Sequence, residues 1–153
     1  MSWLDTFGNN ENSISANDYV TLKNGEYVEG VFLGEPYMYF RIWGEKPYKE
    51  YDKKVDGSNF KFKFNFFTMN NELKIYRGGF KLLKQIRDLI KEYGQNTVFK
   101  IKREGLGTDT VYTLMFKSKI SDADFKKMNE LKLFNFYNSK KQLELAGGED
   151  IPF

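Results

Sequence analysis

The alternation of aromatic and polar residues in two short stretches constrains the fold more than any other feature. The first stretch is FKFKFNFF, residues 60–67, and a β-strand points successive side chains to opposite faces. One face would carry Phe60, Phe62, Phe64 and Phe66, and the other would carry Lys61, Lys63, Asn65 and Phe67. This period of two, together with the high β-propensity of aromatic residues, predicts a strand.

The second stretch is YMYFRIW, residues 37–43, and it has the same two-faced pattern. One face would carry Met38, Phe40 and Ile42, and the other would carry Tyr37, Tyr39, Arg41 and Trp43. If the two strands are neighbours in a sheet, the rings and cations of both stretches lie side by side.

Further strands and two helices are predicted along the chain. Runs at 19–23 and 26–34 flank Asn24-Gly25, which favours a hairpin turn because both positions tolerate positive φ. Other strands are expected at 73–77, 97–103 and 110–119. Apolar residues at helical spacing predict a helix over 80–93 that stops at Gly94. Ser121 with Asp124 is typical of the start of a short helix.

This order of elements predicts an all-β fold with minor α. The layout that fits is a five-stranded OB-fold barrel with a helix between strands three and four and a short C-terminal helix, although other all-β layouts stay open. A chain of 153 residues has the size of one domain. We expect a flexible N-terminal arm at 1–17, the OB-fold domain at 18–138 and an acidic C-terminal tail at 139–153.

The composition excludes several classes of function. The chain has no cysteine and no histidine, so disulfide frameworks, the usual zinc sites and histidine-based catalysis are not available to it. The loop acids Glu45, Glu50, Asp52 and Asp56 lie among as many lysines, which indicates solvated charge rather than a magnesium site. Gly105-Leu106-Gly107 is interpreted as a hairpin turn, because no phosphate-loop Lys-Ser pair follows it. We therefore expect no enzyme, no cofactor and no metal.

The expected location is the cytoplasm. No stretch approaches the roughly 20 apolar residues that a membrane span needs, and MSWLDTFGNN does not have the pattern of a signal peptide.

Charge is distributed unevenly along the chain. The net charge is +3, but residues 74–103 hold nine basic and two acidic residues. The last ten residues hold three acids and no base. A basic body with an acidic tail is therefore predicted, and a basic surface attracts polyanions.

The aromatic and basic face is the candidate binding surface, because single-stranded nucleic acid is held by cations along the phosphates and by rings that stack on bases. The candidate residues for binding single-stranded DNA are Tyr37, Tyr39, Arg41, Trp43, Lys61, Lys63, Phe67, Lys100, Lys102, Arg103 and Tyr112. The competing interpretation is a strand buried on both faces in a sandwich, with a row of lysines that merely discourages edge pairing.

Several stretches resemble known single-stranded DNA-binding proteins. The stretches LKNGEYVEGVFLG, FKFKFNFF, LKIYRGGFKLLKQIRDLIKEYG and IKREGLGTDTVYTLMF resemble the small single-stranded DNA-binding proteins encoded by bacteriophages, over roughly residues 20–117. The final residues, Glu149 to Phe153, resemble the acidic C-terminal tip of bacterial single-stranded DNA-binding proteins.

The resemblance implies an OB-fold that protects single-stranded DNA in phage DNA replication, recombination and repair, in the host cytoplasm and without a membrane. It also implies that the tip docks partner enzymes, such as a polymerase, helicase, primase, nuclease or recombinase. In that role Phe153 is the anchor, Ile151 and Pro152 support it, and Glu149 and Asp150 steer it. The chain departs from the bacterial pattern because a long Gly, Gln and Pro-rich linker is absent.

Two other functions stay open at this stage. An RNA-binding module of cold-shock type would use the same rings, and a phage protein-interaction adaptor would use the aromatic face against another protein. The sequence does not decide whether the chain forms a homo-oligomer.

Overall fold

The computed structural model describes residues 14–136, which form one five-stranded antiparallel sheet with two helices. The strands are β1 (Tyr27–Ile42), β2 (Ser58–Thr68), β3 (Leu73–Gly78), β4 (Thr97–Glu104) and β5 (Val111–Lys119). Their order in the sheet is β3-β2-β1-β4-β5, so β3 and β5 are the edges. The prediction of a mostly β fold with five antiparallel strands is confirmed. The predicted barrel is not, because no ladder joins β3 to β5 within the described residues.

Strand β1 is long and bends in its middle. Its first residues, 27–30, pair with β4, and it pairs with β2 from Gly30 to Ile42. The β1–β2 register shifts between Leu33 and Tyr37, and Gly34 lies there with a φ of 72°. Glycine has no Cβ and adopts this conformation without strain. The separate strands predicted at 26–34 and 37–43 are therefore one strand with a bend at 34–36.

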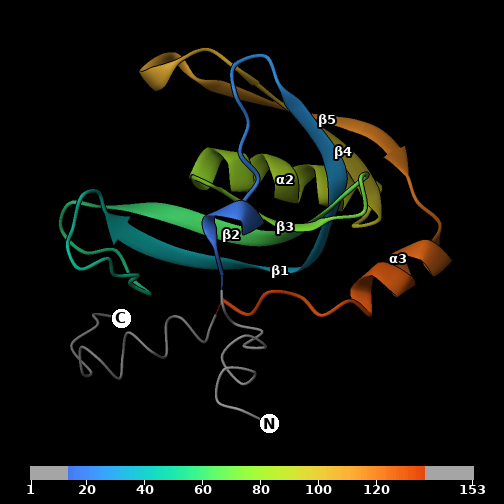
Figure 1. Ribbon diagram of the computed structural model, residues 1–153, viewed down its shortest axis with the longest axis horizontal. Helices are drawn as coiled ribbons and strands as arrows, with labels where there is room; N and C mark the ends of the chain where they lie inside the picture. The colour runs from blue at the N-terminus through green and yellow to red at the C-terminus, as the bar shows by residue number, and fades with distance from the viewer. Residues whose placement is uncertain (1–13, 137–153) are drawn as a thin grey trace, which may run out of the picture.

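Helix α2 (Phe80–Tyr93) lies on the concave side of the curved sheet (Figure 1). Its buried Ile86 and its apolar stripe pack against the inner face of the sheet. The core on this side consists of Phe32, Phe62, Phe64, Phe66, Tyr76, Ile86, Phe99 and Ile101. The bounds of α2 match the prediction from helical spacing.

A second layer covers part of the outer face. Helix α3 (Asp122–Asn129) lies outside the curve of the sheet (Figure 1), and its Phe125 and Met128 pack on Val31 and Leu33. The Ser121 hydroxyl accepts a hydrogen bond from the Asp124 backbone N–H at 3.1 Å, which confirms the predicted helix start. No helix among residues 14–136 is long and apolar enough to cross a membrane.

The segment before β1 crosses from β3 towards β4. It contains the one-turn helix η1 (Ala16–Asp18), and Tyr19 forms a single bridge with Ile75 of β3. The tight turn at Asn24-Gly25 is present, but the strand predicted at 19–23 is not. A second one-turn helix, η2 (Gly107–Asp109), occupies the turn between β4 and β5.

Gly30, the residue of β1 that pairs with both neighbouring strands, allows a test of the packing. Gly30 pairs with both Thr68 and Phe99, and a Cβ there would lie 2.7 Å from the Phe66 ring and would meet the Phe67 carbonyl oxygen. We expect Gly30→Ala to reduce the free energy of unfolding by about 1–3 kcal/mol through overpacking. Urea denaturation measures this change. As a control, Gly79→Ala has open space around its Cβ and should cost less than about 1 kcal/mol; equal losses would contradict the packing argument.

Candidate nucleic-acid interface

A groove of about 740 Å³ lies where β1 and β2 extend beyond α2 and where β3 turns into α2. It is lined by Tyr39, Arg41, Trp43, Asn59, Phe60, Lys61, Arg77, Gly78, Gly79, Phe80, Lys81, Leu82 and Tyr112. Tyr112 belongs to β5, so residues from both edge strands contribute to the groove.

The groove carries four cations and no acid among its lining residues. These cations are Arg41, Lys61, Arg77 and Lys81. Within residues 14–136, none of the four forms an ion pair with a carboxylate. Their charge is therefore available to an anion from solution.

Exposed rings accompany these cations. Trp43 is 86% exposed and Phe80 is 61% exposed, whereas Tyr112 is 39% exposed. The Arg41 guanidinium carbon lies 5.7 Å from the centre of the Trp43 ring, within the range of a cation–π contact. Five of the residues predicted from sequence meet in this groove, namely Tyr39, Arg41, Trp43, Lys61 and Tyr112.

Three predicted site residues are buried, so the expectation of an open face was wrong for them. Tyr37 is 2% exposed, Tyr39 is 3% exposed although it is among the residues that line the groove, and Lys63 is 7% exposed. The register does bring the two predicted faces together, because Tyr39 pairs with Lys61 and Tyr37 with Lys63.

A cover from distant parts of the chain causes this burial. Phe136 stacks on Tyr37 with ring centres 6.0 Å apart, and Tyr19 packs on the same cluster. Asn65 holds the cover in place, because its side-chain amide donates to the Phe134 carbonyl and accepts from the Phe134 N–H at 2.9 Å. The contact joins residues 69 positions apart, which periodicity in the sequence does not reveal.

Phe67 also lies away from the groove. It is half-buried in the outer layer, where it packs with Val31 and Leu33 beneath the chain that includes α3. Its predicted place beside the other rings of the binding face is therefore wrong.

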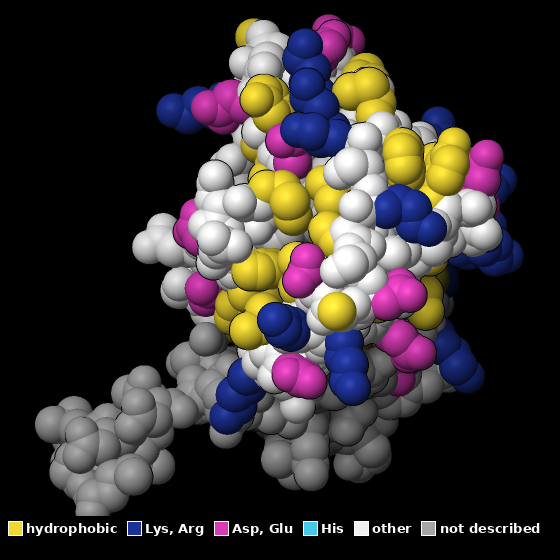
Figure 2. Space-filling model, turned by 90° about the vertical axis from the view of Figure 1, so that its right-hand side faces the viewer, with side chains coloured by type: hydrophobic (Ala, Val, Ile, Leu, Met, Phe, Trp, Pro, Cys, Tyr) yellow, Lys and Arg dark blue, Asp and Glu magenta, His cyan; other side chains and the backbone are white. Residues whose placement is uncertain are grey.

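The three predicted cations of β4 do not line the groove either. Arg103 is part of the fold, because its Nη1 donates to the Leu22 carbonyl at 2.6 Å. Lys102 lies 3.4 Å from a Glu104 carboxylate oxygen, and Lys100 lies over the Tyr27 ring. On the side of the molecule that carries β5 and α3, acids and hydrophobic side chains are interspersed with Lys and Arg (Figure 2).

Sequence reasoning missed three contributors to the groove, which are Arg77, Phe80 and Lys81. From the sequence, the apolar side of the helix at 80–93 is interpreted as facing the barrel and its basic side as a solvated surface, with no site assigned to either. The feature of the sequence that could have indicated them is Gly78-Gly79. Gly78 ends β3 and Gly79 precedes α2, so the helix begins beside the end of the β1–β2 ladder that leads to the loop 43–57. A helix that begins there places its first side chains beside those of both strands.

A buried ionic centre lies next to the groove. Glu50 is 1% exposed and lies 2.7 Å from the Lys63 ammonium nitrogen. Burial opposes the charge of Lys63, but the Glu50 carboxylate outweighs it, and the pKa of Lys63 is raised. Burial raises the pKa of the Tyr39 and Tyr48 hydroxyls, and nearby Glu50 adds to this effect.

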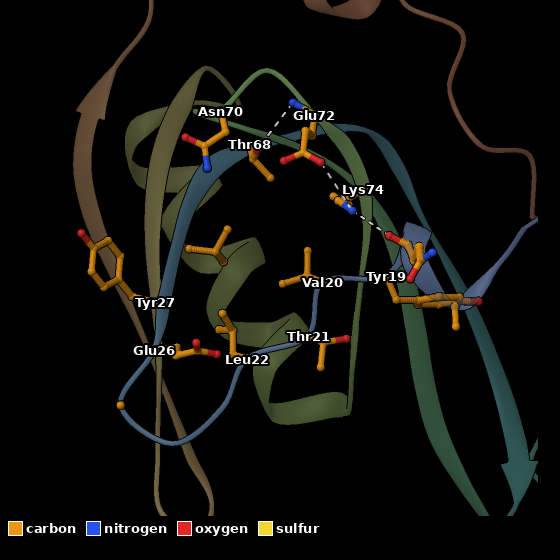
Figure 3. Close-up of a pocket in the computed structure, with 14 residues that line it drawn as sticks. Tyr19, Val20, Thr21, Leu22, Glu26, Tyr27, Thr68, Asn70, Glu72 and Lys74 are labelled. Atoms are coloured by element: carbon orange, nitrogen blue, oxygen red, sulfur yellow. Dashed lines mark hydrogen bonds and ion pairs between the residues drawn. The ribbon is translucent and has the colours of Figure 1, made fainter.

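A second hollow of about 610 Å³ lies between the segment before β1 and the β2–β3 turn (Figure 3). Val20 and Leu22 line it, and its rim includes Glu26 and Glu72. Lys74, the cation of this rim, lies 3.6 Å from Glu72 and donates to the Asn17 carbonyl. This hollow is therefore a poorer site for a polyanion than the cationic groove.

Two further predictions concern the C-terminal tip and metal binding. The tip residues Glu149, Asp150, Ile151, Pro152 and Phe153 lie outside the described residues, so partner docking by the tip stays a prediction. Among residues 14–136, no three acidic side chains are grouped closely enough to hold a metal ion.

Comparison with known proteins gives no relative. No protein-family model matches the chain, and no curated protein or solved structure is significantly similar to it. Function is therefore inferred from the groove.

The Glu50–Lys63 pair predicts how stability depends on pH. Because the pKa of Lys63 is raised above 10.5, its charge stabilises the fold below that pH, and this contribution is lost as pH rises through the folded-state pKa. Tyr39 acts in the same direction above pH 10.0, since its hydroxyl ionises more easily in the unfolded chain. We expect urea denaturation to show stability that falls as pH rises above about 10.

Two variants test the assignment to Lys63. Lys63→Met should be less stable at pH 8, because it leaves Glu50 without its cation, and it should lose less stability as pH rises. Lys126→Met, at an exposed position of α3, should keep the wild-type pH dependence. A Lys63→Met curve parallel to that of the wild type would refute the assignment.

Proposed function

We propose that the protein binds single-stranded DNA without sequence preference, in the cationic groove. The observation that carries the proposal is a set of four cations that have no acidic partner within residues 14–136 and that lie beside exposed rings, at the end of the β1–β2 ladder where β3 turns into α2. Phosphates would follow Arg41, Lys61, Arg77 and Lys81, and bases would stack on Trp43 and Phe80. Every base has a π-face, so stacking tolerates any sequence.

The architecture supports this proposal. Five antiparallel strands, with α2 between β3 and β4 in the chain, agree with an OB-fold layout whose barrel is partly open. Arg77 of β3 and Tyr112 of β5 line the same groove, which therefore spans the two edges of the sheet. The stretches that resemble phage single-stranded DNA-binding proteins point to a role in DNA replication and recombination, with the segment 149–153 docking partner enzymes.

The Trp43 ring provides the first test. We expect Trp43→Ala to weaken binding of oligo-dT by about 1–3 kcal/mol, the value of one lost base stack. Fluorescence anisotropy of labelled oligo-dT measures the affinity. Leu131→Ala is the control, since Leu131 is 42% exposed but does not line the groove. Wild-type affinity in Trp43→Ala, or no binding by the wild type at low salt, would rule out the proposal.

The salt dependence of binding provides a second test. The logarithm of the affinity should fall with the logarithm of salt concentration by about 0.7 per phosphate contacted. Arg77→Gln and Lys81→Gln should each reduce this slope by about 0.7, whereas Lys127→Gln on the exposed side of α3 should not. An equal reduction in all three variants would show that only overall charge matters.

Competition between nucleic acids separates the proposal from RNA binding. Matched oligo-dT and oligo-rU should compete for the same rings, and the proposal requires that the DNA bind at least as tightly. A clear preference for the RNA would assign the groove to RNA instead.

A further inference from the structure

The loop between β1 and β2, residues 43–57, is held by a carboxylate that does not itself line the groove. The Glu50 side chain accepts three hydrogen bonds, from the Tyr37 hydroxyl at 2.9 Å, the Tyr48 hydroxyl at 2.7 Å and the Lys63 ammonium at 2.7 Å. Tyr37 belongs to β1 and Lys63 to β2, so the centre attaches the loop to both strands.

One of these donors connects the centre to the groove. Tyr48 is 41% exposed, its hydroxyl donates to Glu50, and its ring centre lies 4.7 Å from the Arg41 guanidinium carbon. Arg41 in turn lies against Trp43. Within residues 14–136 the buried Nε of Arg41 has no hydrogen-bond partner, so two rings rather than an acid hold this guanidinium.

A contribution to stability does not by itself explain why Glu50 and Lys63 form a buried ion pair here. A buried ion pair is often no more stabilising than apolar side chains of similar volume. Its location suggests a second role, because the same carboxylate that pairs with Lys63 also fixes the ring beneath Arg41.

We propose that Glu50 is a positioning residue for the groove. Glu50 acts through the Tyr48 hydroxyl to hold Arg41 where it can bind a phosphate and Trp43 where a base can stack on it. This inference rests on the proposed function. Glu50 does not line the groove, and the route that we assign to it runs through Tyr48 to Arg41.

Tyr48→Phe is the sharpest variant, because it removes the hydroxyl that reaches Glu50 and keeps the ring beneath Arg41. We expect its affinity for oligo-dT to fall by roughly 3- to 10-fold, the effect of a hydrogen bond to a charged group that is felt only in part at the ligand. Unchanged affinity would overturn the inference.

Tyr51→Phe is the matched control. The Tyr51 hydroxyl also donates to a carboxylate of the same loop, that of Glu45 at 2.9 and 3.0 Å, but the rings that lie against Arg41 are those of Trp43 and Tyr48, not that of Tyr51. Its affinity for oligo-dT should stay at the wild-type level. An equal loss in both variants would show that the loop matters only through its general stability, and it would overturn the specific role of Glu50.

A double-mutant cycle tests the route through Arg41. In an Arg41→Gln background, Tyr48→Phe should cause no further loss of affinity, because the side chain that it positions is gone. Additive losses would contradict this route.

A measurement on the free protein separates this inference from the proposed function. The heteronuclear NOE of the Trp43 indole N–H should fall in Tyr48→Phe, as Arg41 loses its fixed support, and it should not change in Tyr51→Phe. An unchanged NOE in Tyr48→Phe would overturn the positioning role even if oligo-dT binds. If the wild type fails to bind oligo-dT but the NOE falls, the positioning role stands and the proposed function fails.

Discussion

Burial of both faces of the β1–β2 ladder is the constraint on which the rest of the structure depends. The inner face is lined by phenylalanines, and α2 packs onto it. The outer face carries Val31, Leu33, Tyr37 and Tyr39, and it needs a cover of its own. Because β1 spans 16 residues and bends at Gly34, no single element covers its whole outer face. Helix α3 packs on one half, and chain near residues 19 and 136 packs on the other.

The groove exists because this cover stops short of the end of the ladder. Beyond Tyr39, β1 continues to Arg41, whose guanidinium lies against Tyr48 of the loop, and Lys61 of β2 lines the same groove. The turn at Gly78-Gly79 then brings the first residues of α2 to the same place. The cations of the groove, which would be costly to bury without partners, are therefore gathered at an end of the ladder that solvent reaches.

The loop between β1 and β2 links the buried and the exposed parts of this ladder. Its Tyr51 pairs with the β1 backbone at Phe40, and its Glu50 enters the buried layer to meet Lys63. Lys63 alternates with phenylalanines and resembles a solvated lysine in the sequence. Its partner lies 13 residues away in a loop, so only the closure of the loop shows that the charge is neutralised inside the protein.

The sequence by itself determined the local structure. Period-two alternation predicted β2 and the second half of β1, helical spacing predicted α2 to its end at Gly94, and Ser121 predicted the start of α3. These elements depend on neighbours within a few residues, whose geometry the backbone imposes.

Only the tertiary structure decided which side of each strand meets solvent. The period-two pattern assigns Tyr37 and Trp43 to the same face, yet Tyr37 in β1 is 2% exposed and Trp43, in the turn that follows β1, is 86% exposed. The difference comes from Phe136 and Glu50, which reach Tyr37 from distant positions and do not reach Trp43. Alternation assigns a residue to a face, whereas burial depends on what the rest of the chain places over that face.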